Sequence, residues 1–401
     1  MRIDDFKRVE AAAVWSAGRR CASLRRDRGG ITFAYDPDYR GPAVATTLPV
    51  EGIDVHVAGG AVPPFFAGLL PEGRRLAAIR RAAKTSADDD LTLLLAVGAD
   101  TIGNTQVVPE GEEPRTPDPG LARPLVELDF AELFASVLTP DSRDRAAIPG
   151  VQDKVSGHMI ALPVAMADAA WILKLDPPEF PHLVANEAFF LAAARRSGLR
   201  VADSELVHDR TGRPGLLVRR FDRVLRGGKR TALPQEDACQ VLGRYPADKY
   251  RITSEEIVRG LAGVTGAPIV AARELVRQLA FAYLTGNGDA HGKNFSVLHD
   301  RGEWHVAPAY DLPSTHPYGD ATMALSIGGR SREDLGRADF VKLGAVAGVA
   351  KAAVERVLDD LLAAMPAWLD RLGELPFDAR VLHKLGQSCK YRAGRLRGRR
   401  G

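Results

Sequence analysis

Residues 284–298 read LTGNGDAHGKNFSVL, and this stretch is the most informative part of the sequence about fold and function. It follows a predicted helix over residues 274–284, and it sets Asp289 five residues before Asn294. A second carboxylate, Asp311, comes shortly afterwards in the segment VAPAYDLP. Carboxylate and amide oxygens are the hard ligands that Mg²⁺ takes in proteins. Because Asn, Gly and Asp also dominate ordinary turns, a plain polar turn is the alternative interpretation.

The order of these three groups is the one that protein kinases use. In a kinase, the first Asp accepts or orients the proton of the substrate hydroxyl, and the Asn and the second Asp hold Mg²⁺ on the ATP phosphates. The pattern D-x-x-x-x-N is short and weakly specific on its own. It therefore needs support from other parts of the chain.

Lys174 gives part of that support, because it interrupts the apolar stretch WILKL at residues 171–175. In a strand, Lys174 shares one face with Ile172, while the other side chains of the stretch point the opposite way. A buried lysine is costly unless an anion meets it. Kinases place such a lysine on the ATP phosphates and pair it with a helical glutamate, for which Glu187 is the candidate. An edge strand that leaves Lys174 in solvent is the alternative.

Residues 148–157, IPGVQDKVSG, are a third candidate. A glycine-bearing turn with a lysine can cradle phosphates through backbone N–H groups and one ammonium group. The segment fits neither the Walker pattern nor the G-x-G-x-x-G pattern. A plain β-turn is therefore the alternative here.

The composition is that of an ordinary globular protein, with 45% hydrophobic and 26% charged residues. A chain of 401 residues is expected to form two domains, or three. No apolar run approaches the roughly 20 residues of a membrane span, and the N-terminal residues include acids where a secretory signal is basic. Three distant cysteines exclude a disulfide framework and a thiolate metal cluster, and a net charge of +3 does not indicate a nucleic-acid binder. We therefore expect a cytoplasmic protein.

The clearest break in the chain is PEGEEPRTPDPGLARP at residues 109–124, which is rich in proline, glycine and acid and lacks periodicity. We predict a small α/β N-terminal domain over residues 1–112, a linker over 113–124, a strand-rich lobe over 125–225 and a helical lobe over 226–401, the two lobes forming one domain over 125–401. A strand-rich lobe followed by a helical lobe is the layout of two-lobed ATP-grasping enzymes, although order alone is weak support.

Local patterns predict individual elements within these units. The strands that we expect cover residues 31–35, 55–57, 105–108, 171–175 and 216–221. The helices that we expect cover residues 87–97 with Ser86 as N-cap, 183–197, 274–284, and 351–372 with a break at Pro366, and the capping box Thr253-x-x-Glu256 opens one more.

Taken together, these segments resemble the HipA family, the toxin kinases of type II toxin–antitoxin modules. The resemblance runs from about Trp15 to the arginine-rich end of the chain, and its most specific motifs are D-x-H-x-K-N-F-S and L-P-Q-E-D. The stretches that carry it are LLPEG (69–73), IPGVQDK (148–154), LKLD (173–176), NE (186–187), VRRFDR (218–223), LPQEDACQ (233–240), KY (249–250), GDAHGKNFSV (288–297) and PAYDL (308–312).

The resemblance implies an α+β fold, in which a small α/β N-terminal subdomain precedes a two-lobed protein-kinase-like core of a strand-rich lobe and an all-helical lobe. It implies a serine/threonine protein kinase that uses ATP and Mg²⁺. Such kinases phosphorylate a cytosolic protein, in the best-known case an aminoacyl-tRNA synthetase, and so inhibit translation. The implied partner is a HipB-like DNA-binding antitoxin, so that DNA is contacted only through the complex and no membrane is involved.

The resemblance also implies roles for single residues. Asp289 would be the catalytic base, and Asn294 and Asp311 the Mg²⁺ ligands. Gln235, Glu236 and Asp237 would lie near the active site. The residues implied to bind the nucleotide are Pro149, Gly150, Val151, Gln152, Asp153 and Lys154 of the phosphate loop, the ATP lysine Lys174, the hinge residues Arg219, Arg220 and Phe221, and His291, Gly292, Lys293, Asn294, Tyr310 and Asp311.

The chain departs from the family pattern at two places. Arg219 stands where the hinge usually carries an acidic residue, which removes any carboxylate contact to the nucleotide but leaves backbone contacts possible. Residues 146–147 are both alanine where some relatives have a serine that is autophosphorylated to switch the enzyme off. Ser142 and Ser156 are nearby substitutes, which phosphopeptide mapping would detect.

Two other functions remain open at this point. One is an antitoxin-bound co-repressor with little kinase activity, and the other is a small-molecule kinase. The presence of all the chemical residues argues against the first, and the LLPEG-bearing N-terminal segment favours a protein substrate over a small molecule. The arginine-rich end of the chain could contact DNA phosphates in such a repressor complex or be a solvated terminus.

Overall fold

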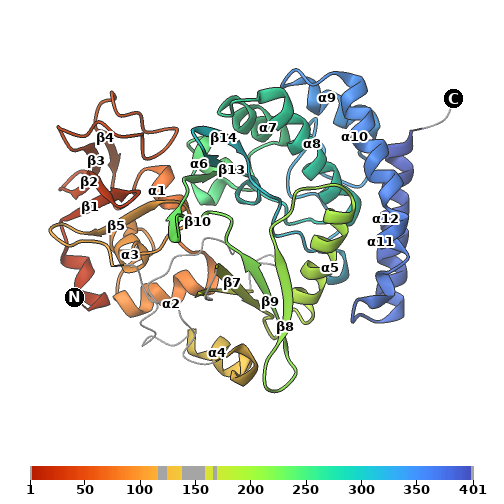
Figure 1. Ribbon diagram of the computed structural model, residues 1–401, viewed down its shortest axis with the longest axis horizontal. Coiled ribbons are helices and arrows are strands. Elements are labelled where there is room, and N and C mark those ends of the chain that lie inside the picture. The colour runs from red at the N-terminus through yellow and green to blue at the C-terminus, as the bar shows by residue number, and fades with distance from the viewer. Residues whose placement is uncertain (1, 116–123, 138–158, 166–168, 399–401) are drawn as a thin grey trace.

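The computed structural model describes residues 2–115, 124–137, 159–165 and 169–398. In Figure 1 the N-terminal domain, in red and orange, lies at one end of the molecule, and the C-terminal helices, in blue, lie at the other. The predicted phosphate loop, Ser142, Ser156 and most of the linker lie outside the described residues.

The N-terminal domain is built on a five-stranded antiparallel sheet in the order β4-β3-β2-β1-β5. One face of this sheet packs against helices, in a core that includes Leu24, Ile31, Phe66 and Leu94. The strands are β1 (Ala11–Ser16), β2 (Arg19–Arg26), β3 (Gly30–Tyr35), β4 (Val55–Ala58) and β5 (Thr105–Pro109), and the helices are η1 (Ile3–Arg8), α1 (Pro64–Gly68), α2 (Gly73–Ala83) and α3 (Asp90–Val97).

The three strands expected in this domain are present, whereas the expected helix starts late. Helix α3 begins at Asp90 rather than at residue 87. Its N-cap is Asp89, which accepts a hydrogen bond from the Thr92 N–H at 3.4 Å, so the prediction that Ser86 caps this helix is wrong. Both residues are of types that cap helices, and only the tertiary structure decides between them.

The strand-rich lobe is a four-stranded antiparallel sheet in the order β6-β7-β9-β8. On one face, Phe130 and Phe134 of α4 pack in a cluster with Leu173 and Leu217. On the other face, β9 contributes to the large core that it shares with α5. The elements of this lobe are η2 (Leu125–Glu127), α4 (Phe130–Val137), β6 (Ile160–Ala165), β7 (Ala170–Leu175), α5 (Leu183–Arg196), β8 (Ser204–His208) and β9 (Pro214–Arg219).

The helical lobe is arranged around α8, which is buried over most of its length and packs against α7, α9, α10 and α12. Thr253 and Glu256 form the predicted capping box of α7, and Pro366 separates α10 from α11 as predicted. The helices are α6 (Ala238–Val241), η4 (Pro246–Asp248), α7 (Ser254–Gly263), α8 (Pro268–Thr285), η5 (Gly292–Asn294), η6 (His316–Tyr318), α9 (Arg337–Ala345), α10 (Lys351–Ala364), α11 (Pro366–Leu369), η7 (Leu372–Glu374) and α12 (Ala379–Arg397).

The helical lobe also carries strands that the sequence did not predict. A hairpin joins β10 (Arg223–Arg226) to β11 (Lys229–Ala232), and a small sheet has the order β12-β13-β14. Strand β12 (Gln235–Asp237) is buried yet consists of three polar residues, so no alternation of apolar and polar side chains marks it. Its partners are β13 (Ser296–Asp300) and β14 (Glu303–Val306), and β13 directly follows the stretch that contains Asp289 and Asn294.

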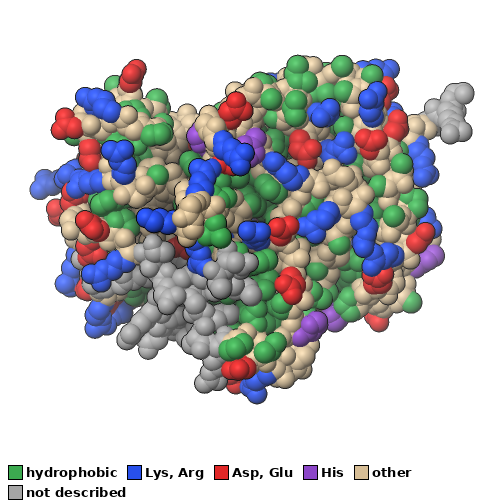
Figure 2. Space-filling model, viewed as in Figure 1, with side chains coloured by type: hydrophobic (Ala, Val, Ile, Leu, Met, Phe, Trp, Pro, Cys, Tyr) green, Lys and Arg blue, Asp and Glu red, His purple; other side chains and the backbone are tan. Residues whose placement is uncertain are grey.

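The surface carries both signs of charge. Figure 2 shows basic and acidic side chains interspersed over the visible face, in keeping with the small net charge. No helix within the described part of the chain has the length and apolar character to span a bilayer.

Candidate active site

Lys174 stands on β7, which lies between β6 and β9, so the alternative of an edge strand with a solvated lysine is wrong. Its Nζ lies 2.7 and 2.8 Å from the two carboxylate oxygens of Glu187 on α5, and 2.9 Å from Oδ1 of Asp311. Glu187 is fully buried and Lys174 exposes 13% of its side chain. Burial by itself lowers the pKa of Lys174, but the carboxylates of Asp311 and Glu187 outweigh it and raise that pKa. The ammonium group is therefore charged.

The loop that follows α8 brings Asn294 and Asp311 together. Helix α8 ends at Thr285 and is capped by Gly286, whose left-handed backbone (φ 69°) turns the chain. The Asn294 Nδ2 donates to Oδ2 of Asp311 at 2.5 Å, and its Oδ1 accepts from the His291 N–H at 3.1 Å. Asp311 itself has φ 57°, a strained backbone for a residue other than glycine and one that is concentrated at functional sites. Both predicted Mg²⁺ ligands thus face each other.

Asp289 is held from two sides. Its N–H donates to Oδ1 of Asn287 at 3.0 Å, and Nδ2 of Asn287 donates to the carbonyl of Asp311 at 3.3 Å. Its Oδ1 accepts a hydrogen bond from the hydroxyl of Tyr250. Burial raises the pKa of Tyr250, and the Asp289 carboxylate adds to the rise. Tyr250 therefore stays protonated and orients a carboxylate that is only 4% exposed.

A cavity between the two lobes gathers most of the predicted site. Met159, Ile172, Val218 and Phe221 give it an apolar wall beside charged groups, a combination that suits a ligand with one flat apolar end and one charged end. The predicted residues that line it are Lys174, Arg219, Arg220, Phe221, His291, Lys293, Asn294, Tyr310 and Asp311, together with Gln235 and Asp237.

Of the predicted site residues that the structure describes, Asp289, Gly292, Glu187 and Glu236 do not line this cavity. Asp289 contacts Tyr250. Gly292 packs against Ile252, where an added Cβ would come within 2.2 Å of the Ile252 side chain. The absence of a side chain at Gly292 thus serves close packing of the loop.

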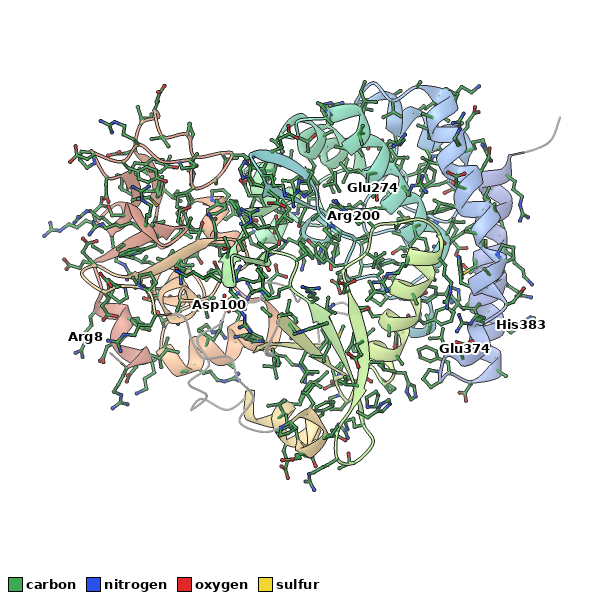
Figure 3. All side chains as sticks on the ribbon, in the orientation of Figure 1. Arg8, Asp100, Arg200, Glu274, Glu374 and His383 are labelled. Atoms are coloured by element: carbon green, nitrogen blue, oxygen red, sulfur yellow. The ribbon has the colours of Figure 1, made fainter. Side chains whose placement is uncertain are left out.

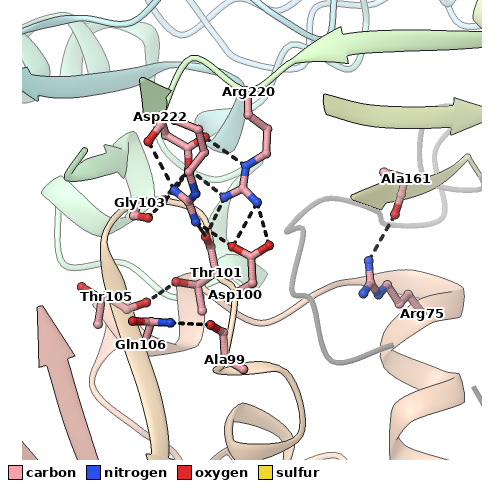
Figure 4. Close-up of polar contacts among 11 residues, drawn as sticks. Arg75, Ala99, Asp100, Thr101, Gly103, Thr105, Gln106, Ala161, Arg220 and Asp222 are labelled. Atoms are coloured by element: carbon pink, nitrogen blue, oxygen red, sulfur yellow. Dashed lines mark hydrogen bonds and ion pairs between the residues drawn. The ribbon is translucent and has the colours of Figure 1, made fainter. Parts of the chain in front are cut away.

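The hinge motif VRRFDR anchors the N-terminal domain. The buried guanidinium of Arg220 donates to both Oδ atoms of Asp100 at 3.1 and 3.0 Å and to both Oδ atoms of Asp222 at 3.1 and 2.9 Å. Figure 4 shows these contacts of Arg220 with Asp100 and Asp222. Arg223 bridges the same two carboxylates at 2.7 Å each. Figure 3 shows Asp100 where the N-terminal domain meets the rest of the molecule. Although burial raises the pKa of Asp222, the two arginines outweigh it and lower that pKa to about 2.

The other two hinge residues, Arg219 and Phe221, do not contact the N-terminal carboxylate Asp100. Arg219 approaches Asp203 at 3.6 Å, and both side chains are about half exposed. The ring of Phe221 packs against that of Tyr310, with 5.6 Å between the centroids. Phe221 therefore adds an aromatic ring to the apolar wall of the cavity.

The groups behind the loop over residues 287–294, which we name the candidate catalytic loop because it contains Asp289 and Asn294, are paired as well. The Tyr310 hydroxyl donates to the Lys293 carbonyl at 2.7 Å, and Lys293 Nζ donates to the Gly68 carbonyl at 3.1 Å. Burial lowers the pKa of His291 to about 3, and Lys249 adds to the effect, so this imidazole is neutral.

The L-P-Q-E-D motif contacts the N-terminal domain. Glu236 accepts from the N–H and the hydroxyl of Thr46 at 2.7 and 2.8 Å, and burial raises the pKa of Glu236 to about 7. Asp237 caps α6 by accepting from the Gln240 N–H at 2.9 Å. Gln240 in turn donates to the carbonyl of Phe65 at 2.9 Å. The motif thus fastens α1 and the helical lobe together.

Comparison with known proteins identifies the family. Residues 146–369 match the HipA-like C-terminal domain family, and residues 12–108 match the HipA N-terminal domain family. The chain belongs to the HipA family.

The HipA-family relatives match over long parts of the chain. The protein Y4mE of Sinorhizobium fredii, named as a kinase, is 32% identical over 425 residues, which cover 97% of this chain and 99% of that protein. The serine/threonine-protein kinase toxin HipA of Shewanella oneidensis is 28% identical over 333 residues, covering 76% of this chain and 75% of the toxin. The family resemblance drawn from the motifs is therefore confirmed.

A solved HipA structure shares the fold. It comes from the Shewanella oneidensis toxin–antitoxin complex of HipA, HipB and operator DNA. The TM-score is 0.73 at 21% identity, and the match covers 96% of each chain. The predicted α+β, two-lobed kinase-like fold is confirmed.

Among the described residues around this HipA-type site, Glu72, Asp100, Lys249, Tyr250 and Asn287 had no predicted role. Glu72 and Tyr250 lie inside the motifs LLPEG and KY, so the motif match marked them without suggesting a function. Asp100 lies outside these motifs and acts through contacts with distant parts of the chain, while Asn287 adjoins the GDAHGKNFSV motif.

Proposed function

We propose that this HipA-family protein is a serine/threonine protein kinase that uses ATP and Mg²⁺ and acts as the toxin of a toxin–antitoxin module. The observation that carries the proposal is the joining of four groups at one cavity. Lys174, paired with Glu187, contacts Asp311, and Asp311 contacts Asn294. Residues from β7, α5, η5 and the loop after β14 meet there, which a polar turn alone would not produce. The relatives that are named kinases support the same function.

Phosphoryl transfer relies on positioning and on neutralising charge. In this proposal Lys174 holds the ATP phosphates, together with the loop over residues 149–154. Asp289 orients the hydroxyl of the protein substrate, and Tyr250 fixes the direction of the Asp289 carboxylate. The apolar wall with Phe221 receives the base.

The residues present fit a magnesium ion. The side chains of Asp311 and Asn294 contact each other, and carboxylate and amide oxygens are the donor types that Mg²⁺ prefers. They would hold the ion, and bound Mg²⁺ would neutralise charge on the phosphates. Meanwhile Lys174 keeps the Asp311 carboxylate ionised, because burial raises its pKa but the ammonium group outweighs burial and lowers it.

The remaining parts of the proposal concern the cellular role. A HipB-like antitoxin is proposed as partner, supported by the complex of the related HipA with HipB and operator DNA. The substrate is proposed to be a cytosolic protein, with an aminoacyl-tRNA synthetase as first candidate, so that phosphorylation inhibits translation. The division into residues 1–112, 113–124 and 125–401 belongs to the proposal, and so does a cytoplasmic location.

Phosphotransfer from labelled ATP with Mg²⁺ tests the kinase directly. The purified protein is incubated with lysate proteins, beside the variants Asp289→Asn and Asp311→Asn. We expect a discrete labelled protein band with the wild type and none with either variant, while circular dichroism shows that both variants are folded. Wild type that binds ATP without labelling any protein would favour the co-repressor, and label found only in small molecules would favour a small-molecule kinase.

A further inference from the structure

The N-terminal domain reaches into the candidate catalytic loop with one carboxylate. Glu72, from the LLPEG motif, is the N-cap residue of α2. Its Oε1 lies 3.1 Å from Nζ of Lys293, and its Oε2 contacts Nζ of Lys249. The side chains of Lys249, Lys293 and Glu72 are 0%, 4% and 11% exposed. Three charges are thus buried together where the N-terminal domain meets the helical lobe.

Glu72 is the carboxylate that both lysines share. Burial raises the pKa of Glu72, but Lys293 and Lys249 outweigh it and hold that pKa well below its ordinary value. Asp237 also faces Lys293, whereas Lys249 pairs with Glu72. A buried ammonium group without a partner carries a large desolvation penalty. Glu72 therefore helps to fix the positions of both ammonium groups.

The same two lysines hold the backbone of the candidate catalytic loop. The carbonyl of Lys249 accepts from the Gly292 N–H at 3.0 Å. The carbonyl of Lys293 accepts from the Tyr310 hydroxyl at 2.7 Å, next to the strained Asp311. Lys293 directly precedes Asn294 and lines the same cavity as Lys174. A displaced Lys293 would thus disturb the groups proposed to bind phosphates and Mg²⁺.

The turn of α2 that follows Glu72 contacts the other lobe. Arg74 lies 2.7 Å from Glu179, and Arg75 donates to the Ala161 carbonyl of β6 at 3.1 Å (Figure 4). One turn of the N-terminal domain therefore touches both lobes on either side of the cavity. This arrangement keeps Glu72 at a fixed position relative to Lys174 as well as to Lys293.

We propose that Glu72 is a positioning residue of the active site, which holds Lys293 beside the ATP phosphates, so that the N-terminal domain is part of the catalytic machinery. The inference rests on the proposed kinase function and assigns a task to the LLPEG motif. It differs from a purely structural role, in which Glu72 would only balance the charge of buried lysines.

The experiment compares kcat for phosphotransfer and melting temperature in Glu72→Gln, Lys249→Met and the double variant Glu72→Gln/Lys249→Met. The matched control is Glu110→Gln, because Glu110 pairs with Arg20 at 2.8 Å on the surface of the same domain. The double variant removes the negative charge of Glu72 and the positive charge of Lys249 together. The net charge of the cluster is then that of the wild type, but Lys293 still lacks the carboxylate of Glu72.

We expect Glu72→Gln to lower kcat at least tenfold and to lower the melting temperature, and Glu110→Gln to match the wild type. The double variant should recover the melting temperature but keep kcat at least tenfold low. A double variant whose kcat returns to within threefold of the wild type would overturn the inference, because charge balance would then be the whole role of Glu72.

Two further outcomes also decide the matter. If the glutamine variants do not fold, Glu72→Asp keeps the charge but shortens the reach: a fivefold lower kcat at unchanged melting temperature supports positioning, and wild-type kcat refutes it. If the wild type itself transfers no phosphate, the proposed function fails and this inference fails with it. An active wild type with an equally active Glu72→Gln refutes this inference alone.

Discussion

Replacing Glu187 with Gln tests the electrostatics at the centre of the site. The side chain keeps its shape and loses its charge, in a fully buried position. Lys174 then has Asp311 as its remaining carboxylate contact, at 2.9 Å. The ammonium group is drawn toward Asp311, the proposed metal ligand, and away from the place where the ATP phosphates would meet it. We therefore expect weaker transition-state stabilisation.

The structure sets the size of this effect. Two contacts of 2.7 and 2.8 Å join Lys174 to the carboxylate of Glu187. The amide oxygen of Gln can still accept one of them, so the loss is close to one charge-assisted hydrogen bond, worth about 1.5–3 kcal/mol. Because about 1.4 kcal/mol corresponds to a factor of ten in rate, kcat/KM for ATP should fall about 10- to 150-fold.

Steady-state phosphotransfer at varied ATP concentration measures this quantity. Glu205→Gln is the matched control, because Glu205 is exposed on β8 of the same sheet and should leave kcat/KM unchanged. Circular dichroism and melting temperature show whether the Glu187 variant is folded. A folded Glu187→Gln protein with kcat/KM within threefold of the wild type would refute the role assigned to the Lys174–Glu187 pair.

Three more predictions follow from other contacts. Tyr250→Phe removes the hydroxyl that orients Asp289, so kcat should fall about fivefold, as the loss of one net hydrogen bond implies; ATP affinity should not change, and an unchanged kcat would count against this role. Asp100→Asn leaves the buried Arg220 and Arg223 with one carboxylate between them, so the free energy of unfolding should fall by about 3 kcal/mol. Denaturant unfolding measures this change, and an unshifted midpoint would show that Arg220 does not need Asp100 as a partner. The pKa of Glu236 is raised to about 7, so its favourable contribution is complete below about pH 4.5 and is lost as pH rises through 7. Relative to wild type, Glu236→Gln should therefore melt at increasingly higher temperature from pH 5 to pH 8, and a constant difference would contradict the shift.

The fold could be predicted where local patterns are strong. Alternation located β7 and placed Lys174 on the face opposite Leu173, and helical periodicity located α5 and α8. Prediction failed where local signals compete or are absent. Two capping residues precede α3, and the sequence does not tell which of them is used. Strand β12 is polar although it is buried, because its side chains contact other parts of the chain rather than an apolar core.

The site shows the same division. The proximity of Lys174, Glu187, Asn294 and Asp311 could be predicted, because each residue sits in a local motif and phosphoryl transfer would need these residue types together. Asp100 could not, because its partner Arg220 is 120 residues away in sequence. The reach of Glu72 to Lys249 spans 177 residues. Contacts of this kind depend on how the domains pack against each other. The periodicity of apolar residues along the chain carries no information about that packing, so these contacts could not be predicted from the sequence.

The two charged clusters between the N-terminal domain and the kinase-like core should respond differently to mutation. The cluster of Asp100, Arg220, Asp222 and Arg223 lies at the hinge, and none of its charges belongs to the candidate catalytic loop. Buried ion pairs add little net stability but are costly to break, so losing Asp100 should weaken docking without moving Asn294. Glu72 instead holds Lys293 next to the proposed metal ligands. Breaking the hinge cluster should therefore lower stability and leave kcat unchanged, whereas Glu72→Gln should lower both. If the domain docks as one rigid unit, kcat would fall in the hinge variants as well.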